Sequence, residues 1–215
     1  IDNASQQVLD RRSQIIARVP YINDDNTLPY RGNAYLIQHQ QRVLPGIYTR
    51  RKKNDEIEAH ANIMPRDGVA HRYVLDPAKG RIQMQIGQAH LPLVPVLRAL
   101  GANDKQIKEA WGEQVFNANA SGDDVATLRK LGERLLPDDT LPSDIGVLKA
   151  KIAERIRQFK IDPEVSQATL GQPYKNIDVD PILQATKKVL AVHRGEAEPD
   201  ARDDLPFQRF YGPEQ

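Results

Sequence analysis

The sequence contains no cysteine. This absence excludes a disulfide-stapled scaffold, a thiolate zinc site, an iron–sulfur cluster and a cysteine nucleophile, and it fits a reducing compartment. Long apolar runs are also missing, because the most apolar stretch, residues 91–100, is interrupted by Pro92, Pro95 and Arg98. A membrane-spanning helix needs about 20 apolar residues. We therefore expect no membrane partner.

Motifs of a self-contained active site are missing as well. There is no glycine-rich phosphate loop, no GxGxxG and no GxSxG nucleophile elbow. The histidines show no metal-ligand spacing; they are His39, His60, His71, His90 and His193. The paired carboxylates fall at expected helix starts or loops, where acidic residues favour the helix dipole; they are Asp123-Asp124, Asp138-Asp139, Asp178/Asp180 and Asp203-Asp204. We expect no metal site and no catalytic residue in this chain.

Charge is nearly balanced, with a formal net charge of +1. Residues 1–160 carry 24 Lys and Arg against 19 Asp and Glu, whereas residues 161–215 carry 6 against 10. Nucleic-acid-binding domains usually have a pI above about 9 or a clear basic stripe. Composition alone therefore does not identify a nucleic-acid-binding protein, but it predicts a mildly basic body followed by an acidic segment.

Hydrophobic periodicity changes once along the chain. Alternation with period two predicts strands at residues 34–39, 47–50, 57–63, 71–75 and 81–86. Helical spacing then predicts helices at residues 94–100, 103–111, 125–135 and 145–159, the last of these capped by Ser143, and a final helix from Asp180-Pro181 to Gly195. A sheet followed by helices indicates an α+β fold, with an antiparallel sheet in the N-terminal half and a helical half after it, in one composite domain.

Two features are candidates for contacting nucleic acid. Arg50, Arg51, Lys52 and Lys53 follow one another at the end of an expected strand, where they could meet phosphates or simply form a charged turn that blocks aggregation. Residues 200–210 interleave both charges with aromatic rings. Arginine can donate two hydrogen bonds to guanine, and aspartate can accept a hydrogen bond from a base amino group. This segment could therefore recognise a base, or it could be a linker.

Several segments together resemble one family, the β subunit of multisubunit DNA-directed RNA polymerases. RGNAYLI followed by LPGIY (residues 31–37 and 44–48) resembles its "NGTERV" strand leading to "SPGVYF", and ANIMPRDG with the strand after it (61–76) is similar to "AxIIPxRGxWLxFExD". LP, LRALG and Ile107 (91–107) resemble "LPxxxLLRALGxxxxEI", and residues 182–205 resemble "KLLxLxxGExxxDDIDHLGNRR". The matches occur in the family's order.

The resemblance implies a segment of a longer protein, consistent with a chain that opens on Ile1. Residues 1–42 would be a flank of the protrusion, residues 43–198 a lobe-like α+β domain, and residues 199–215 the return to the protrusion. The lobe lines the DNA channel and contacts downstream and non-template DNA, initiation factors and other polymerase subunits (β′, α or their equivalents). Nucleotidyl transfer and its Mg²⁺ belong to another subunit, so no cofactor is expected in this segment.

The same resemblance directs attention to particular residues. Asp203 matches an aspartate near a non-template guanine, and Arg209 matches the second of two closing arginines, whereas Gln208 replaces the first and Pro206-Phe207 replaces a Gly-Asn pair. The DNA-contact candidates are Arg42, Arg50, Arg51, Lys52, Lys53, Arg202, Asp203 and Arg209. The implied location is cytoplasmic and nucleoid-associated, or a virion or infected cell for a phage or reduced polymerase.

Two other hypotheses compete with this one. The first is an independent adaptor that binds a protein partner through its helices. The second is a small metal-dependent hydrolase that uses Asp178, Asp180 and His193.

Overall fold

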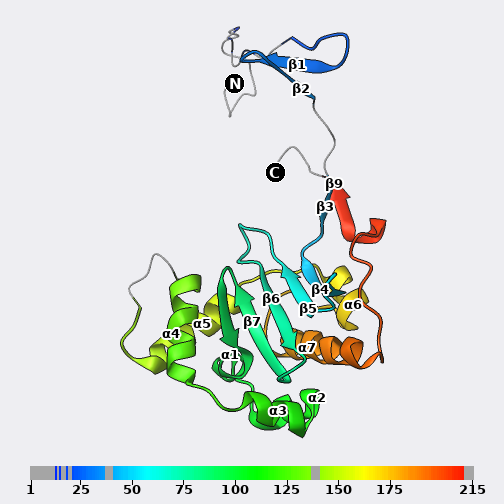
Figure 1. The fold of residues 1–215 in the computed structure, drawn as a ribbon. Coiled ribbons are helices and arrows are strands. Elements are labelled where there is room, and N and C mark those ends of the chain that lie inside the picture. Colours follow the sequence, from blue (N-terminus) through cyan, green and yellow to red (C-terminus); the bar gives the residue numbers. More distant parts are fainter. Residues whose placement is uncertain are drawn as a thin grey trace, which may run out of the picture. The chain divides into compact units, whose positions relative to one another are not determined.

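The computed structural model describes residues 13, 15, 18, 21–36, 41–136 and 141–210 (Figure 1). The chain divides into two compact units, residues 1–40 with 210–215 and residues 41–209. The assignment of the flanks and the lobe to residues 1–42, 43–198 and 199–215 stays a prediction.

The described part of the first unit contains a short β-hairpin. Strand β1 (Thr27–Tyr30) pairs antiparallel with β2 (Asn33–Leu36). Arg31 and Gly32 between them have φ values of 47° and 80°, the left-handed conformation that a tight type I′ hairpin turn requires. The expected strand at residues 34–39 corresponds to β2 as far as Leu36, and residues 37–39 lie outside the described residues.

A five-stranded antiparallel sheet forms the centre of the second unit, in the order β4-β5-β6-β7-β8. The strands are β4 (Gly46–Arg51), β5 (Ile57–Asn62), β6 (His71–Asp76), β7 (Arg81–Ile86) and β8 (Ala89–Pro92). Each strand pairs with the next one along the chain, so the sheet is a meander. The period-two prediction is confirmed for β4 to β7.

Seven helices follow the sheet within the described residues, which confirms the α+β expectation. They are α1 (Leu93–Leu100), α2 (Asp104–Trp111), α3 (Glu113–Asn119), α4 (Asp124–Leu135), α5 (Ile145–Arg157), α6 (Pro163–Leu170) and α7 (Val179–Arg194). No helix in the described part of the chain is long and apolar enough to cross a membrane.

Two predicted helix starts are wrong by one or two residues. The cap of α5 is Asp144, whose side chain accepts from the Val147 amide at 2.8 Å, rather than Ser143. Helix α7 is capped by Asp178, so it begins ahead of Asp180-Pro181. In both cases a neighbouring carboxylate accepts from a free backbone amide of the first turn: Asp144 lies one residue after the predicted cap of α5, and Asp178 lies two residues before the predicted start of α7.

The two faces of the sheet differ in polarity. Strand register places Ile47, Ala61, Tyr73 and Met84 on one face, where they are buried in the hydrophobic core. Helices α1, α3 and α7 pack against strands β4 to β7, and α4 packs against β8. Burial of this apolar face is the main source of stability, at about 25 cal/mol for each Å² removed from water. The opposite face carries the polar side chains of the strands.

The chain enters and leaves the second unit through neighbouring strands. Strand β3 (Gln41–Val43) pairs with β9 (Gln208–Phe210) in a two-stranded sheet, and the Leu44 amide donates to the Phe207 carbonyl at 2.7 Å (Figure 1). We call this pair of strands the stem. The residues between β3 and β9 therefore begin and end at neighbouring positions, as an inserted domain does.

Candidate nucleic-acid interface

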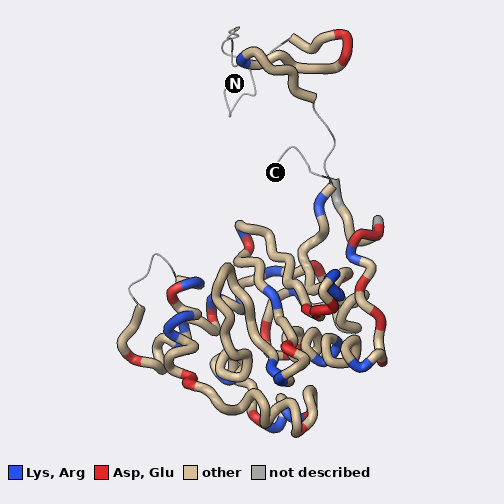
Figure 2. The backbone as a smooth tube through the Cα atoms, viewed as in Figure 1, with Lys and Arg blue, Asp and Glu red and all other residues tan. Residues whose placement is uncertain are grey.

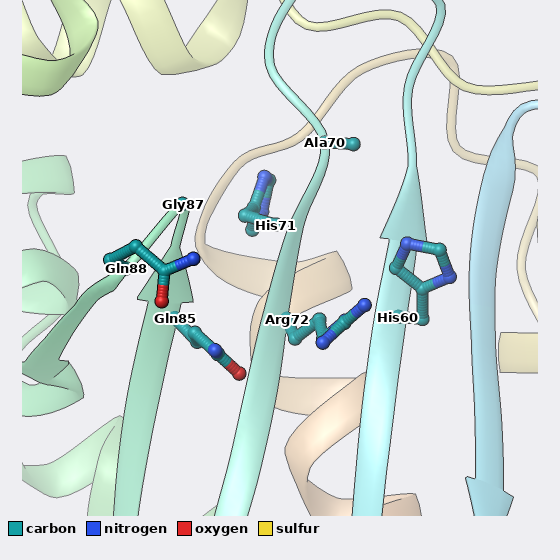
Figure 3. A pocket seen from close by; sticks show the side chains of 7 residues that line it. All are labelled: His60, Ala70, His71, Arg72, Gln85, Gly87 and Gln88. Atoms are coloured by element: carbon teal, nitrogen blue, oxygen red, sulfur yellow. The ribbon is translucent and has the colours of Figure 1, made fainter.

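The polar face of the sheet carries a row of side chains set by strand register. Tyr48 pairs with His60, His60 with Arg72, and Arg72 with Gln85, so the four residues lie side by side across β4 to β7. Figure 3 shows His60, Arg72 and Gln85 on neighbouring strands. The apolar residues that alternate with them face helices α1, α3 and α7. Tyr48, at one end of the row, is buried, and the side chains of His60, Arg72 and Gln85 are partly exposed.

Beside this row, three cations converge on Glu58, whose side chain is 0% exposed. Arg50 donates from Nε to Glu58 Oε1 at 2.6 Å, and Lys52 Nζ lies 2.8 Å from Oε2. Arg72 Nε is more distant, at 3.6 Å from Oε1. The cationic side chains remain 29%, 27% and 38% exposed. We call these four residues the Glu58 cluster; it presents a buried anion beneath partly exposed cations.

Both sides of the pair Lys52–Glu58 are charged at neutral pH. Burial by itself would raise the pKa of Glu58, but hydrogen bonds from Lys52 and Arg50 outweigh it and lower the pKa. Burial would likewise lower the pKa of Lys52, but hydrogen bonds to Glu56 and Glu58 raise it. Glu56 contacts Lys52 Nζ at 2.7 Å and lies at the rim of the cluster.

The structure separates the four adjacent cations of the basic run. As predicted, they lie where β4 ends in a hairpin turn, closed by a hydrogen bond from the Lys52 amide to the Glu56 carbonyl at 2.8 Å. Arg50 and Lys52 join the Glu58 cluster. Arg51 instead donates to the Val192 carbonyl in the last turn of α7, at 3.3 Å. Lys53 is exposed in the turn, so the run does not act as one block of charge.

A shallow hollow of about 320 Å³ adjoins the cluster on the polar face. His60, Arg72, Gln85 and Gln88 supply its polar lining (Figure 3). His60 Nδ1 is buried and has no hydrogen-bond partner. Burial first, and then the charges of Arg50 and Arg72, lower the pKa of His60 to about 4. The imidazole is therefore neutral at physiological pH, and the positive charge of the face comes from arginine and lysine.

The return segment after α7 runs along the free edge of β4. The Asp200 amide donates to the Thr49 carbonyl, and the Thr49 amide donates to Asp200 Oδ2, both at 2.7 Å. Asp200 also forms a 2.5 Å ion pair with Lys188 of α7 and is 8% exposed. Phe207 packs edge-on against Tyr48, with ring centroids 5.6 Å apart. These contacts fix the segment beside the polar face.

The remaining candidates lie at this segment and at the stem. Arg202 is 3.4 Å from Asp203, which is 83% exposed, and the charge of Arg202 contributes to lowering the pKa of His60. Gln208 donates from its side chain to the Asp203 carbonyl at 2.9 Å. Arg42 belongs to β3. The backbone of Arg209 is in β9, and its side chain lies outside the described residues.

The hydrolase hypothesis does not fit the geometry. Asp178 and His193 stand at opposite ends of α7, and fifteen residues at 1.5 Å each separate them by about 22 Å. Asp178 caps this helix and pairs with Arg157 at 3.1 Å. Among the described residues, no three His, Cys, Asp or Glu side chains are grouped so that they could hold a metal ion. Asp178, Asp180 and His193 therefore do not form one site.

No sequence motif marks Arg72 or Glu58, although both belong to the Glu58 cluster. Arg72 sits in an alternating strand between buried His71 and Tyr73, so period two placed it on the polar face. Its approach to Glu58 depends on the register of β5 with β6, which no local pattern fixes. Figure 2 shows basic residues on strands and helices alike and a mostly acidic stretch after α7.

Comparisons with known proteins do not assign the chain to a family. No protein-family model matches it, and no curated protein matches it significantly. The likeness to the polymerase β subunit rests on the sequence motifs.

Proposed function

We propose that this chain is a lobe-like segment of a multisubunit DNA-directed RNA polymerase β subunit, and that the polar face of its sheet contacts the DNA backbone. The observation that carries the DNA contact is the convergence of Arg50, Lys52 and Arg72 on the polar face of the sheet, where their side chains remain partly exposed. Partly exposed guanidinium and ammonium groups bind phosphate oxygens with charge-assisted hydrogen bonds.

The stem supports a place inside a larger protein. Because β3 and β9 pair, residues 44–207 leave and rejoin the chain path at one point, as an inserted module does. The family resemblance implies such an excursion of the lobe from the protrusion. In this proposal the chain helps to position the DNA. Its partners are DNA, the other polymerase subunits and an initiation factor. Catalysis and its Mg²⁺ reside on another subunit.

The DNA contact is tested with the double variant Arg50→Gln/Arg72→Gln in the 215-residue chain. Each fully lost phosphate contact reduces the slope of log K against log salt by roughly 0.9, so we expect the slope for binding to a labelled duplex of about 30 base pairs to fall by between about 1 and about 2. The matched control is Lys130→Gln/Lys149→Gln, which removes two exposed cations from α4 and α5. Equal slopes for the two double variants would refute a DNA-contacting sheet face.

In an assembled polymerase, the same double variant is expected to shorten the lifetime of the open promoter complex. The helical control is expected to leave that lifetime unchanged, because its cations lie on the helical half of the domain. An unchanged open complex in the sheet-face variant would separate this chain from the proposed role in transcription.

An adaptor that binds a protein partner through its helices is the second candidate. Val125 of α4 and Val147 of α5 are 45% and 50% exposed, and they favour it. This candidate predicts that Val125→Ser/Val147→Ser abolishes partner capture while the sheet-face variant retains it. The polymerase proposal predicts loss of DNA contact in the sheet-face variant alone.

A further inference from the structure

Glu58 is the feature of the polar face that DNA contact alone does not explain. It is the only acidic side chain that is fully buried in the described part of the chain. Burying a carboxylate is costly unless it is paired and hydrogen-bonded. A sheet face that served only to attract phosphates would be stronger without it, because the carboxylate occupies the same donors that a phosphate oxygen needs.

We propose that Glu58 is an internal counter-ion that limits how strongly Arg50, Lys52 and Arg72 bind DNA phosphates. This inference rests on the proposed function and assigns the regulation of that same face. The Glu58 oxygens lie 2.6 Å from Arg50 Nε and 2.8 Å from Lys52 Nζ, distances at which a phosphate oxygen would bind. Since Glu58 is held in place by the sheet, it competes with DNA at a high effective concentration.

The consequence is a weak contact with a shallow salt dependence. Binding of DNA releases counter-ions in proportion to the phosphates neutralised, with a slope of about 0.9 for each. Three cations that were free to bind phosphate would give a slope of log K against log salt of about 2.7. Pairing of these cations with Glu58 lowers that slope. Such a weak contact suits a surface along which a DNA duplex must move, because each phosphate is readily replaced by the next one.

The experiment compares Glu58→Gln with Glu56→Gln in the full chain. Both substitutions remove one negative charge near Lys52, but Glu56 is at the rim, with a side chain 33% exposed, and touches neither arginine of the cluster in the contacts described. Binding to a labelled duplex of about 30 base pairs is measured by anisotropy between about 50 and 200 mM KCl. We expect Glu58→Gln to steepen the salt slope by about 1, with tighter binding at low salt, and Glu56→Gln to change it by less than half as much.

Equal effects of the two substitutions would overturn the inference, because net charge alone would then account for them. A weaker Glu58→Gln complex with an intact circular dichroism melt would overturn it as well, since Glu58 would then organise the cations rather than compete for them. If Glu58→Gln does not fold, Glu58→Asp replaces it and Glu56→Asp is the control. Glu58→Asp keeps the net charge but withdraws the carboxylate by one methylene, and tighter DNA binding is again expected.

The two proposals fail in different ways. If Arg50→Gln/Arg72→Gln binds DNA with the same salt slope as the helical control, the DNA-contacting face itself is wrong. If that double variant loses DNA contact while Glu58→Gln equals Glu56→Gln, the face is retained and only the role of Glu58 is rejected.

Discussion

Acidification should destabilise this protein through His71, the first residue of β6, whose side chain is buried. Its Nδ1 lies 2.9 Å from the Val69 carbonyl, and its Nε2 lies 2.7 Å from the Tyr73 hydroxyl. Because a carbonyl only accepts, Nδ1 carries the proton and Tyr73 donates to Nε2. A second proton on the ring would deprive the Tyr73 hydroxyl of its acceptor and bury a charge beside Phe159.

Burial lowers the pKa of His71 from 6.5 to about 4. The folded state therefore binds fewer protons than the unfolded state in this pH range, and the stabilisation is complete above pH 6.5 and is lost as the pH falls toward 4. Each unit of pKa corresponds to about 1.4 kcal/mol, so His71 alone accounts for roughly 2 kcal/mol between about pH 7 and pH 5.

The assay is urea unfolding of wild type, His71→Asn and His90→Asn at about pH 7 and pH 5. The His71→Asn chain should be less stable at the higher pH, because the smaller side chain leaves a void and Tyr73 loses its acceptor. Its free energy of unfolding should also depend less on pH, by roughly 2 kcal/mol across this interval. Exposed His90 is the control. A His71→Asn chain with the wild-type pH dependence would refute the reasoning.

Two further predictions concern the edges of the second unit. Asp200→Ala breaks the buried pair between the return segment and α7, and it should lower the free energy of unfolding by roughly 3 kcal/mol in urea titrations, whereas Asp203→Ala at an exposed site should change it little. Gly68→Ala should lower the melting temperature, because a Cβ atom there would collide with the Phe159 ring and φ is +152°. Gly122→Ala meets open space and is the matched control; an equal loss in both glycine variants would contradict the steric explanation.

The strands and the longer helices could be predicted because their signals are local. Residues 57–63 and 81–86 alternate between apolar and polar side chains, and the spacing of apolar residues in 145–156 follows a helix. Helix α6 is too short to show a clear apolar spacing, although Asp162-Pro163 is a typical helix start and Asp162 accepts from two backbone amides. The ends of helices were less certain because several nearby carboxylates compete to cap them.

The candidate site was only partly predictable. The sequence predicts the basic run at residues 50–53. It does not predict how the run separates, because the separation depends on the contact of Arg51 with the end of α7, far away in the chain. The sequence also predicts Arg202 and Asp203 as candidates. Their place beside the polar face follows from the pairing of Asp200 with Thr49, which is far away in the chain. The role of these residues in binding DNA stays a prediction.

The sequence by itself determined the order of elements, a sheet and then helices, and the identity of the apolar faces, because these depend on periodicity within a few neighbouring residues. Only the tertiary structure decided that Glu58 lies beneath Arg50, Lys52 and Arg72, and that β3 meets β9. Those arrangements depend on strand register and on contacts between distant segments. Many residues contribute to the free energy of these contacts, so no local sequence pattern predicts them.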